Sequence, residues 1–126
     1  MIPEGLKYSK EHEWVKAEGN LATIGITHHA QDQLGDVVYV ELPGAGKELK
    51  ATEEFGVVES VKSVSSLYCP VSGRVVEANA ELNNGPQLVN EDPYGKGWMI
   101  KVEMGSPSDL NSLLSATDYK KLVESK

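Results

Sequence analysis

Two short β-prone runs meet at a small polar turn near the middle of the chain, in residues 55–73 (F-G-V-V-E-S-V-K-S-V-S-S-L-Y-C-P-V-S-G). The apolar residues on the two sides of the turn are Val57, Val58, Val64 and Leu67. Ser60 and Ser63 lie at the turn itself, close to Lys62. Apolar runs of this kind, separated by small polar residues, are typical of two strands joined by a tight turn. We therefore predict a β-hairpin over about residues 55–73, with Lys62 at its tip.

A lysine at the tip of a hairpin holds its amine in water, away from other side chains. An enzyme that acylates one lysine and ignores the others needs this geometry, because the amine must enter its active site. Lys62 is therefore a candidate for modification. The alternative is that Lys62 is an ordinary solvated charge in a turn, as most exposed lysines are.

Two glycines at defined distances from Lys62 favour modification. Gly46 precedes the lysine in G-A-G-K, and Gly73 follows it in P-V-S-G, each where the chain must turn between strands. With this spacing the segment resembles the biotinyl/lipoyl-carrier family, and E-S-V-K-S resembles the lipoyl-lysine motif of glycine cleavage system H proteins. The motif residues before the modified lysine are Glu59, Ser60 and Val61.

Other carriers fit the hairpin less well. Biotin carriers normally place methionines beside the modified lysine, where this chain has Val61 and Ser63. Lipoyl domains of 2-oxoacid dehydrogenases usually place an acidic residue before the lysine, where this chain has Val61. Two positions depart from the H-protein pattern: the usual alanine after the lysine is Ser63 here, and many H proteins have an acidic residue four positions after the lysine, where this chain has Ser66. Ser66 can accept a hydrogen bond but cannot supply a charge.

The resemblance covers essentially the whole chain. Three further segments resemble H proteins: H-E-W at 12–14, I-T-H-H-A-Q-D-Q-L-G-D-V-V-Y-V at 26–40, and L-V-N-x-x-P-Y-x-x-G-W at 88–98. The resemblance implies a mainly β fold, a barrel-sandwich hybrid built as a flattened β-barrel, with an N-terminal hairpin, one short helix and C-terminal helices. It also implies a single lipoyl-carrier domain over residues 1–126.

The N-terminal part of the chain predicts a second hairpin. Residues 8–15 and 21–26 are β-prone, and the Gly-Asn pair at 19–20 between them is a turn signal. The residues expected in the core are Trp14, Val15, Leu21, Ile24 and Ile26. The polar pair His12 and Glu13 fits the outer edge of a strand. The resemblance implies instead that Glu13 lies beside the lipoyl arm of Lys62 when that arm is loaded.

The next segments predict a helix, a strand and a loop. Thr27 is a suitable N-cap and Gly35 a suitable C-cap for a helix over 28–34. Residues 36–42 (D-V-V-Y-V-E-L) alternate only loosely, which predicts a strand buried on much of both faces. Residues 83–94 are rich in turn formers and predict an ordered loop.

The C-terminal part predicts helices over about residues 107–124. Ser106 has the position of an N-cap, followed by Pro107 in the first turn and by Asp109 near the positive end of the helix dipole. Two apolar helical faces follow, formed by Leu110, Leu113 and Leu114, and by Tyr119, Leu122 and Val123. We expect both faces to pack against the sheets.

Composition narrows the classes of partner and location. The chain of 126 residues is 40% hydrophobic and 25% charged, as in globular proteins. Its net charge of -7 argues against nucleic acid as a partner, because phosphate binding requires clustered Lys and Arg. There is no apolar run long enough to cross a bilayer and no signal pattern at the N-terminus. We expect no membrane partner and a cytoplasmic location, or the mitochondrial matrix if the source is a eukaryote.

Few residues suggest other chemistry. Cys69, the single cysteine, lies in an apolar segment and is expected to be a small buried residue. His28 and His29 are neighbours on the predicted helix and point about 100° apart, so we expect no metal site. The serines have no G-x-S-x-G setting and no glycine-rich loop precedes a helix, so we expect a carrier and not an enzyme.

The resemblance implies a specific carrier function. Lys62 would carry lipoate in amide linkage and pass the aminomethyl group of glycine from the P protein, a PLP-dependent decarboxylase, to the T protein, an aminomethyltransferase. The L protein, a dihydrolipoamide dehydrogenase, would reoxidise the arm, and a lipoyl/octanoyl transferase or lipoate ligase would attach it. Two alternatives remain open: a lipoate donor or relay for other lipoyl-dependent complexes, and a β-barrel interaction module whose lysine is unmodified.

Overall fold

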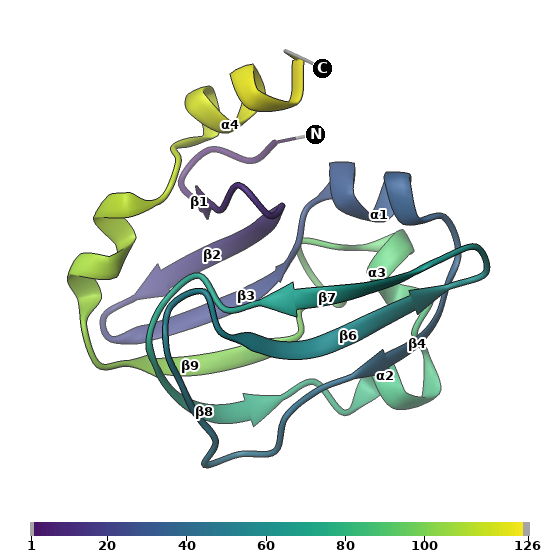
Figure 1. The fold of residues 1–126 in the computed structure, drawn as a ribbon, viewed down its shortest axis with the longest axis horizontal. Coiled ribbons are helices and arrows are strands. Elements are labelled where there is room, and N and C mark those ends of the chain that lie inside the picture. Colours follow the sequence, from purple (N-terminus) through teal and green to yellow (C-terminus); the bar gives the residue numbers. More distant parts are fainter. Residues whose placement is uncertain (1, 125–126) are drawn as a thin grey trace.

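The computed structural model describes residues 2–124, which form two antiparallel β-sheets with short helices around them (Figure 1). The larger sheet has the strand order β1 (Lys7–Tyr8), β2 (Glu13–Glu18), β3 (Leu21–Ile26), β9 (Ile100–Met104), β8 (Gly73–Ala78) and β5 (Glu48–Leu49). The smaller sheet has the order β4 (Val37–Glu41), β6 (Glu54–Ser60) and β7 (Val64–Tyr68). The mainly β fold is confirmed, with one correction: the strands form two separate sheets and not a closed barrel.

The helical segments are short. They are α1 (His28–Leu34), α2 (Glu81–Asn84), α3 (Leu88–Glu91), the 3-10 helix η1 (Pro107–Ser112) and α4 (Ala116–Glu124). Helices α2 and α3 lie where the sequence predicts only a loop, because the turn formers of that segment close two single helical turns. None of the helices in residues 2–124 has the length and apolar character needed to cross a membrane.

The predicted N-terminal hairpin is present as β2 and β3, joined at Gly19, whose φ is +63°. The prediction of one strand over residues 8–15 is wrong, because the chain turns between β1 and β2. The turn is made by His12, which has a φ of +71° and donates its N–H to the Ser9 carbonyl at 3.1 Å. As a result, Glu13 begins β2 with its side chain directed into the protein, where it is 2% exposed.

Helix α1 has the predicted boundaries and caps. Thr27 Oγ1 accepts the Ala30 N–H at 3.2 Å, and Gly35, with a φ of +82°, donates its N–H to the Gln31 carbonyl at 3.0 Å. The strand after it, β4, is not buried on both faces as predicted. It is one of the two edge strands of the smaller sheet and carries a bulge, so that Val38 and Tyr39 are 48% and 53% exposed.

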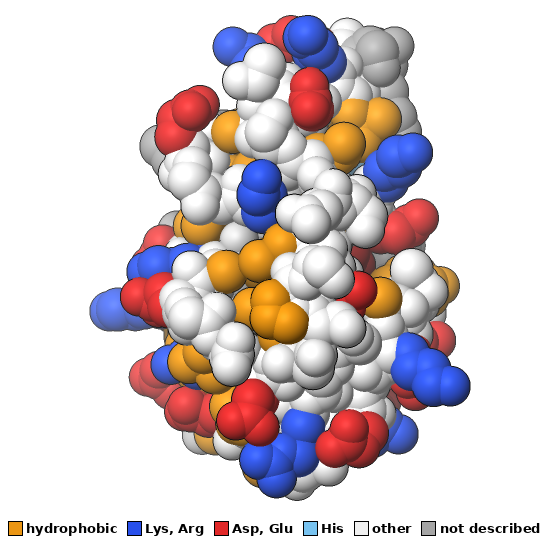
Figure 2. All heavy atoms as spheres, turned by 90° about the vertical axis from the view of Figure 1, so that its left-hand side faces the viewer, with side chains coloured by type: hydrophobic (Ala, Val, Ile, Leu, Met, Phe, Trp, Pro, Cys, Tyr) orange, Lys and Arg blue, Asp and Glu red, His pale blue; other side chains and the backbone are white. Residues whose placement is uncertain are grey.

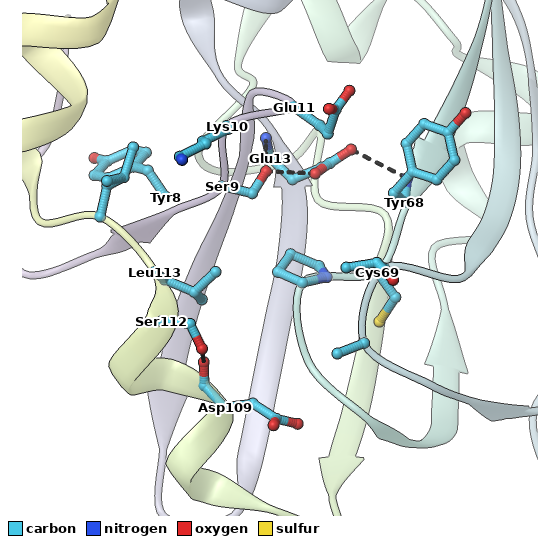
Figure 3. Close-up of a pocket in the computed structure, with 14 residues that line it drawn as sticks. Tyr8, Ser9, Lys10, Glu11, Glu13, Tyr68, Cys69, Asp109, Ser112 and Leu113 are labelled. Atoms are coloured by element: carbon cyan, nitrogen blue, oxygen red, sulfur yellow. Dashed lines mark hydrogen bonds between the residues drawn. The ribbon is translucent and has the colours of Figure 1, made fainter.

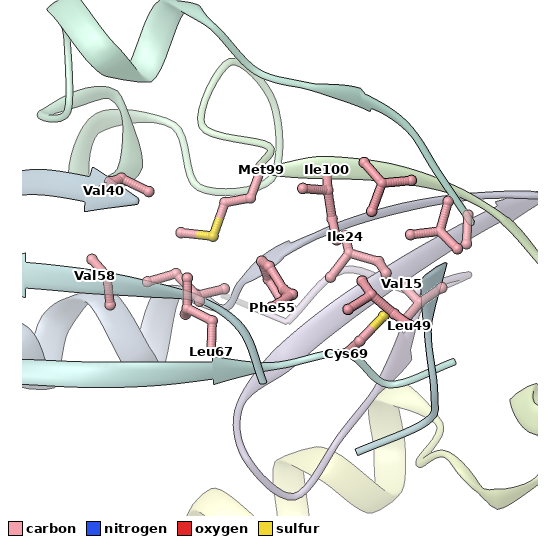
Figure 4. Packing of buried hydrophobic residues seen from close by; sticks show 14 of the residues in the cluster. Val15, Ile24, Val40, Leu49, Phe55, Val58, Leu67, Cys69, Met99 and Ile100 are labelled. Atoms are coloured by element: carbon pink, nitrogen blue, oxygen red, sulfur yellow. The ribbon is translucent and has the colours of Figure 1, made fainter. Parts of the chain in front are cut away.

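The main core fills the space between the two sheets (Figure 4). Of the residues predicted for it, Val15, Ile24 and Ile26 are buried in this core, whereas Leu21 is only half-buried. Cys69 is fully buried, as predicted, and its thiol donates to the Val71 carbonyl at 3.0 Å. Burial also raises the pKa of this thiol to about 11.

A second cluster attaches the C-terminal segment to the N-terminal strands. Tyr119 of α4 stacks on Tyr8 of β1 with ring centroids 4.7 Å apart, and Trp14 belongs to the same cluster. The predicted face of Tyr119, Leu122 and Val123 is therefore found. The expected cap at Ser106 is not, because its side chain makes no capping hydrogen bond and the segment after it is a 3-10 helix.

Candidate functional site

Lys62 lies in the tight turn between β6 and β7, at the end of the hairpin that projects at the right of Figure 1. The Ser60 N–H donates to the Ser63 carbonyl at 2.8 Å and closes the turn. Ser60 Oγ also accepts the backbone N–H groups of Lys62 at 3.3 Å and Ser63 at 3.1 Å. Ser60 is only 5% exposed, so this small side chain fixes the backbone of the turn from inside. These hydrogen bonds explain in structural terms why a serine stands at this position of the E-S-V-K motif.

The side chain of Lys62 is exposed, although its aliphatic part lies near the end of α1. A Cβ added to Gly35 would stand 3.4 Å from Lys62 Cε, an ordinary to tight contact. The Val61 N–H donates to the Asp36 carbonyl at 3.0 Å and holds the tip beside the same segment. Within residues 2–124 the Lys62 amine takes part in no ion pair. A reagent or an enzyme can therefore reach the amine.

The other two motif residues face the solvent. Glu59 is exposed at the end of β6, and Val61 is 70% exposed beside the lysine. Neither side chain packs in the core, so both are accessible to an enzyme that binds the hairpin from outside.

Glu13 is a buried carboxylate and does not lie on the outer edge of a strand, so that interpretation is wrong. Ser9 Oγ donates to one of its oxygens at 2.5 Å, and the Tyr68 N–H donates to the other at 3.1 Å (Figure 3). Burial raises the pKa of Glu13 to about 7, although both hydrogen bonds act in the opposite direction. Glu13 therefore changes its charge near neutral pH in response to small changes around it.

Two cavities meet at Glu13. The larger, about 500 Å³, is lined by apolar and polar side chains from β1, the end of β7, η1 and the segments beside them (Figure 3). Tyr68, Leu113 and Pro70 are among its lining residues. On the side of the molecule that Figure 2 shows, hydrophobic side chains gather near the middle of the face, with charged side chains around them.

The smaller cavity, about 320 Å³, runs from Glu13 along β7 to Ser63, directly next to the lysine. Its walls include Ala30 and Leu34 of α1, and Ser66 of β7. We name it the arm cleft. The exposed carboxylate of Glu11 also lines it, so two acidic side chains stand at the end far from the lysine.

Sequence reasoning did not find Ser9, Glu11 or Tyr68 as neighbours of Glu13. Their approach depends on the turn at His12 and on the contact between the two sheets, and neither follows from local patterns.

The two neighbouring histidines of α1 belong to no cluster of metal ligands. His28 is exposed, and no group of three metal-ligating side chains occurs in the part of the chain that the structure describes.

An isolated, exposed lysine at the tip of a rigid β-hairpin, on a two-sheet scaffold, defines a protein of the lipoyl-carrier class. The sequence model of the glycine cleavage H-protein family matches residues 6–126, and the chain belongs to that family.

Individual relatives agree with this assignment over nearly their full lengths. A glycine cleavage system H protein of Carboxydothermus hydrogenoformans is 61% identical, covering 98% of this chain and 95% of its own. One of Symbiobacterium thermophilum is also 61% identical, covering 94% and 92%. A crystal structure of a glycine cleavage system H protein from Mycobacterium marinum has a TM-score of 0.90 at 37% identity, covering 98% of this chain and 99% of its own. The H-protein resemblance is thereby confirmed.

Proposed function

We propose that this protein is the lipoyl-carrying shuttle of the glycine cleavage system and that lipoate is attached to Lys62 through an amide bond. The observation that carries the proposal is the place of Lys62, exposed at a turn whose backbone is fixed by buried Ser60. An amide at Nζ removes the positive charge and adds a long flexible arm. When bound, the arm supplies disulfide and thiol chemistry at the surface, which the buried thiol of Cys69, the single cysteine, does not provide.

The arm cleft has the length and lining to receive such an arm. Ser66 lies four residues beyond Lys62, which is about 13 Å along a strand. A lipoyl-lysine has about a dozen bonds between Cα and its sulfurs, or roughly 15 Å when extended. The arm therefore reaches the part of the cleft that Ser66 lines, and an aminomethyl group on its sulfur extends it by about 2 to 3 Å toward Glu13, which is held at Tyr68 two residues further along β7. The apolar walls from α1 suit the methylene chain of the arm. Gly35 leaves space for the first methylenes beside the helix end.

Glu13 is the residue that we assign to the loaded arm. An aminomethyl group carries an ammonium, and a buried carboxylate beside it forms a strong charge-assisted contact. Ser9 and Tyr68 orient the carboxylate, and burial keeps water away from the ammonium. Because burial raises the pKa of Glu13 to about 7, arrival of a cation favours its ionised form. Glu13→Gln is expected to shorten the half-life of the aminomethyl form.

Ser66 lines the arm cleft without a charge, so the acidic residue of many relatives is missing on that wall. Glu11 stands on the same cleft with an exposed carboxylate. We assign to Glu11 the second negative charge near the arm, in place of the one that Ser66 cannot supply.

The partners follow from this role. They are the P, T and L proteins, and a lipoyl/octanoyl transferase or lipoate ligase that recognises the E-S-V motif before Lys62 through exposed Glu59 and Val61 and through the turn that buried Ser60 fixes. Tethering raises the effective concentration of the arm at each enzyme, so brief, weak docking is sufficient. The net charge of -7 favours basic docking surfaces on these enzymes. We assign residues 1–126 to one lipoyl-carrier domain and, with bacterial relatives, a cytoplasmic location.

The test is the intact mass of the protein purified from lipoate-replete cells. We expect one added lipoyl group in the wild type and in Lys47→Ala, which removes another exposed lysine, and none in Lys62→Ala. The modified protein should then gain an aminomethyl group from glycine in the presence of the P protein. An unmodified wild type, in cells whose other lipoyl proteins are modified, would support the plain interaction module. A modified protein that accepts nothing from glycine but donates lipoyl groups to other proteins would support the relay.

A further inference from the structure

Large hydrophobic side chains that are exposed to solvent gather at the lysine end of the smaller sheet. In residues 2–124 there are five such residues with exposed fractions between 38% and 70%: Val38, Tyr39, Val61, Val64 and Val76. All except Val76 lie on β4 or at the hairpin tip, around Lys62. We name these four residues, Val38, Tyr39, Val61 and Val64, the hairpin patch. A concentration of this kind marks an interaction surface more often than scattered apolar residues do.

The sheet register makes the patch continuous. Tyr39 of β4 is paired with Glu59 of β6, and Glu59 is paired with Val64 of β7. The three side chains form one row across the outer face, because Val58 and Ser60 on the other side of β6 are buried. The bulge in β4 turns its neighbour Val38 outward as well.

Acidic side chains border the hairpin patch. Glu59 lies within the row, while Asp36 and Glu41 lie at the two ends of β4, and all three are exposed. Neither of the two ion pairs found in residues 2–124 involves them. A complementary surface therefore has an apolar centre and a basic rim.

We propose that the hairpin patch is the docking surface for the enzyme that acylates Lys62, and this inference rests on the function proposed above. Acylation forms the amide bond between Nζ and the acyl carbonyl carbon and breaks the bond from that carbon to a thioester sulfur or an acyl-phosphate oxygen. The ammonium loses one proton before attack and the amine a second one during it. Both protons go to solvent or to the leaving group. The enzyme must therefore bring its acyl donor to Nζ itself.

An unmodified lysine is much shorter than a lipoyl-lysine, and this difference distinguishes the acylating enzyme from the enzymes that act on the finished arm. Nζ of an unmodified lysine is five bonds, or about 6 Å, from Cα, so the active-site wall must cover the hairpin tip and the strands beside it. An enzyme that acts on the end of the finished arm works roughly 15 Å from the same Cα and need not contact the tip. Val61 and Val64 are therefore buried in the complex with the acylating enzyme, and Tyr39 extends that interface across the sheet.

The test measures lipoylation of the unmodified full chain by a purified lipoate ligase with lipoate and ATP. Tyr39→Ser and Val38→Ser are each expected to lower kcat/KM at least about ten-fold, mainly through KM. Val76→Ser, which removes an exposed valine of β8 far from the hairpin, should stay within about two-fold of wild type. Each variant, once fully lipoylated by prolonged incubation, should accept an aminomethyl group at the wild-type rate. Far-ultraviolet circular dichroism and urea unfolding check that the variants fold.

Three results would overturn the inference. The first is an unchanged kcat/KM for lipoylation in both patch variants. The second is an equal loss of lipoylation and of aminomethyl loading, which would make the patch a general surface. The third is a wild-type dimer that Tyr39→Ser converts to a monomer, which would make a second copy of this chain the occupant. A wild type that the ligase never modifies would instead refute the proposed function itself.

Discussion

Replacing Glu13 with glutamine should make the unfolding free energy less dependent on pH. The buried carboxyl has a pKa of about 7 in the folded protein, against an ordinary value of 4.5. Because the folded pKa is raised, the folded state binds the proton more tightly than the unfolded state does. The resulting stabilisation is complete below about pH 4.5 and is lost as the pH rises through about 7.

The size of the effect follows from the two pKa values. Their difference corresponds to about 3 kcal/mol, of which roughly 2.5 kcal/mol is lost between about pH 5 and about pH 8. The side chain is 2% exposed, so solvent screening reduces this little. In Glu13→Gln the amide oxygen can accept the Tyr68 N–H while the amide nitrogen donates to Ser9 Oγ, so the variant imitates the protonated acid.

The assay is urea unfolding of the wild type and Glu13→Gln at about pH 5 and at about pH 8. Other titrating groups are common to both proteins, so the difference between their unfolding free energies isolates Glu13. We expect that difference to move by about 2 to 3 kcal/mol in favour of the variant at the higher pH. Glu18→Gln, which removes an exposed carboxylate at the other end of β2, should follow the wild type within about 0.5 kcal/mol. Parallel curves for wild type and Glu13→Gln would refute the reasoning.

Two further predictions concern the scaffold. Gly56→Ala should lower the unfolding free energy, measured in urea, by about 1 to 3 kcal/mol, because the new Cβ would overlap the Glu41 carbonyl oxygen. Gly44→Ala, with open space around its Cβ, should change the unfolding free energy by less than about 0.5 kcal/mol. Equal effects of the two substitutions would contradict this packing of β4 on β6. Cys69 should react with a disulfide reagent at least about 100-fold more slowly in the native protein than in urea, because it is buried and its pKa is raised to about 11; fast native labelling would show that the segment opens.

The parts of the fold set by local signals could be predicted from the sequence. The lysine hairpin follows from two β-prone runs around a polar turn, and α1 follows from its caps at Thr27 and Gly35. Both depend on residues adjacent in the chain, and the observed hydrogen bonds at Ser60 and Thr27 are local. The resemblance to H proteins supplied the fold class, which local patterns alone do not determine.

The parts set by contacts between distant segments could not be predicted. The burial of Glu13 depends on the positive φ of His12, which nothing in K-E-H-E-W indicates, and on Tyr68, 55 positions away in sequence. The exposure of Tyr39 depends on the edge position of β4, and a strand pattern does not state which strands have two neighbours. The arm cleft is formed by α1 and β7, so it becomes visible only in three dimensions.

The most direct test of the central claim locates the modification on the chain. Trypsin cleaves after unmodified Lys50, Lys62 and Arg74, but an acylated lysine resists cleavage. Protein from lipoate-replete cells should therefore give one peptide over residues 51–74 that carries the lipoyl mass, with fragment ions placing it on Lys62. Separate, unmodified peptides over 51–62 and 63–74, or a lipoyl group on any other lysine, would contradict the account.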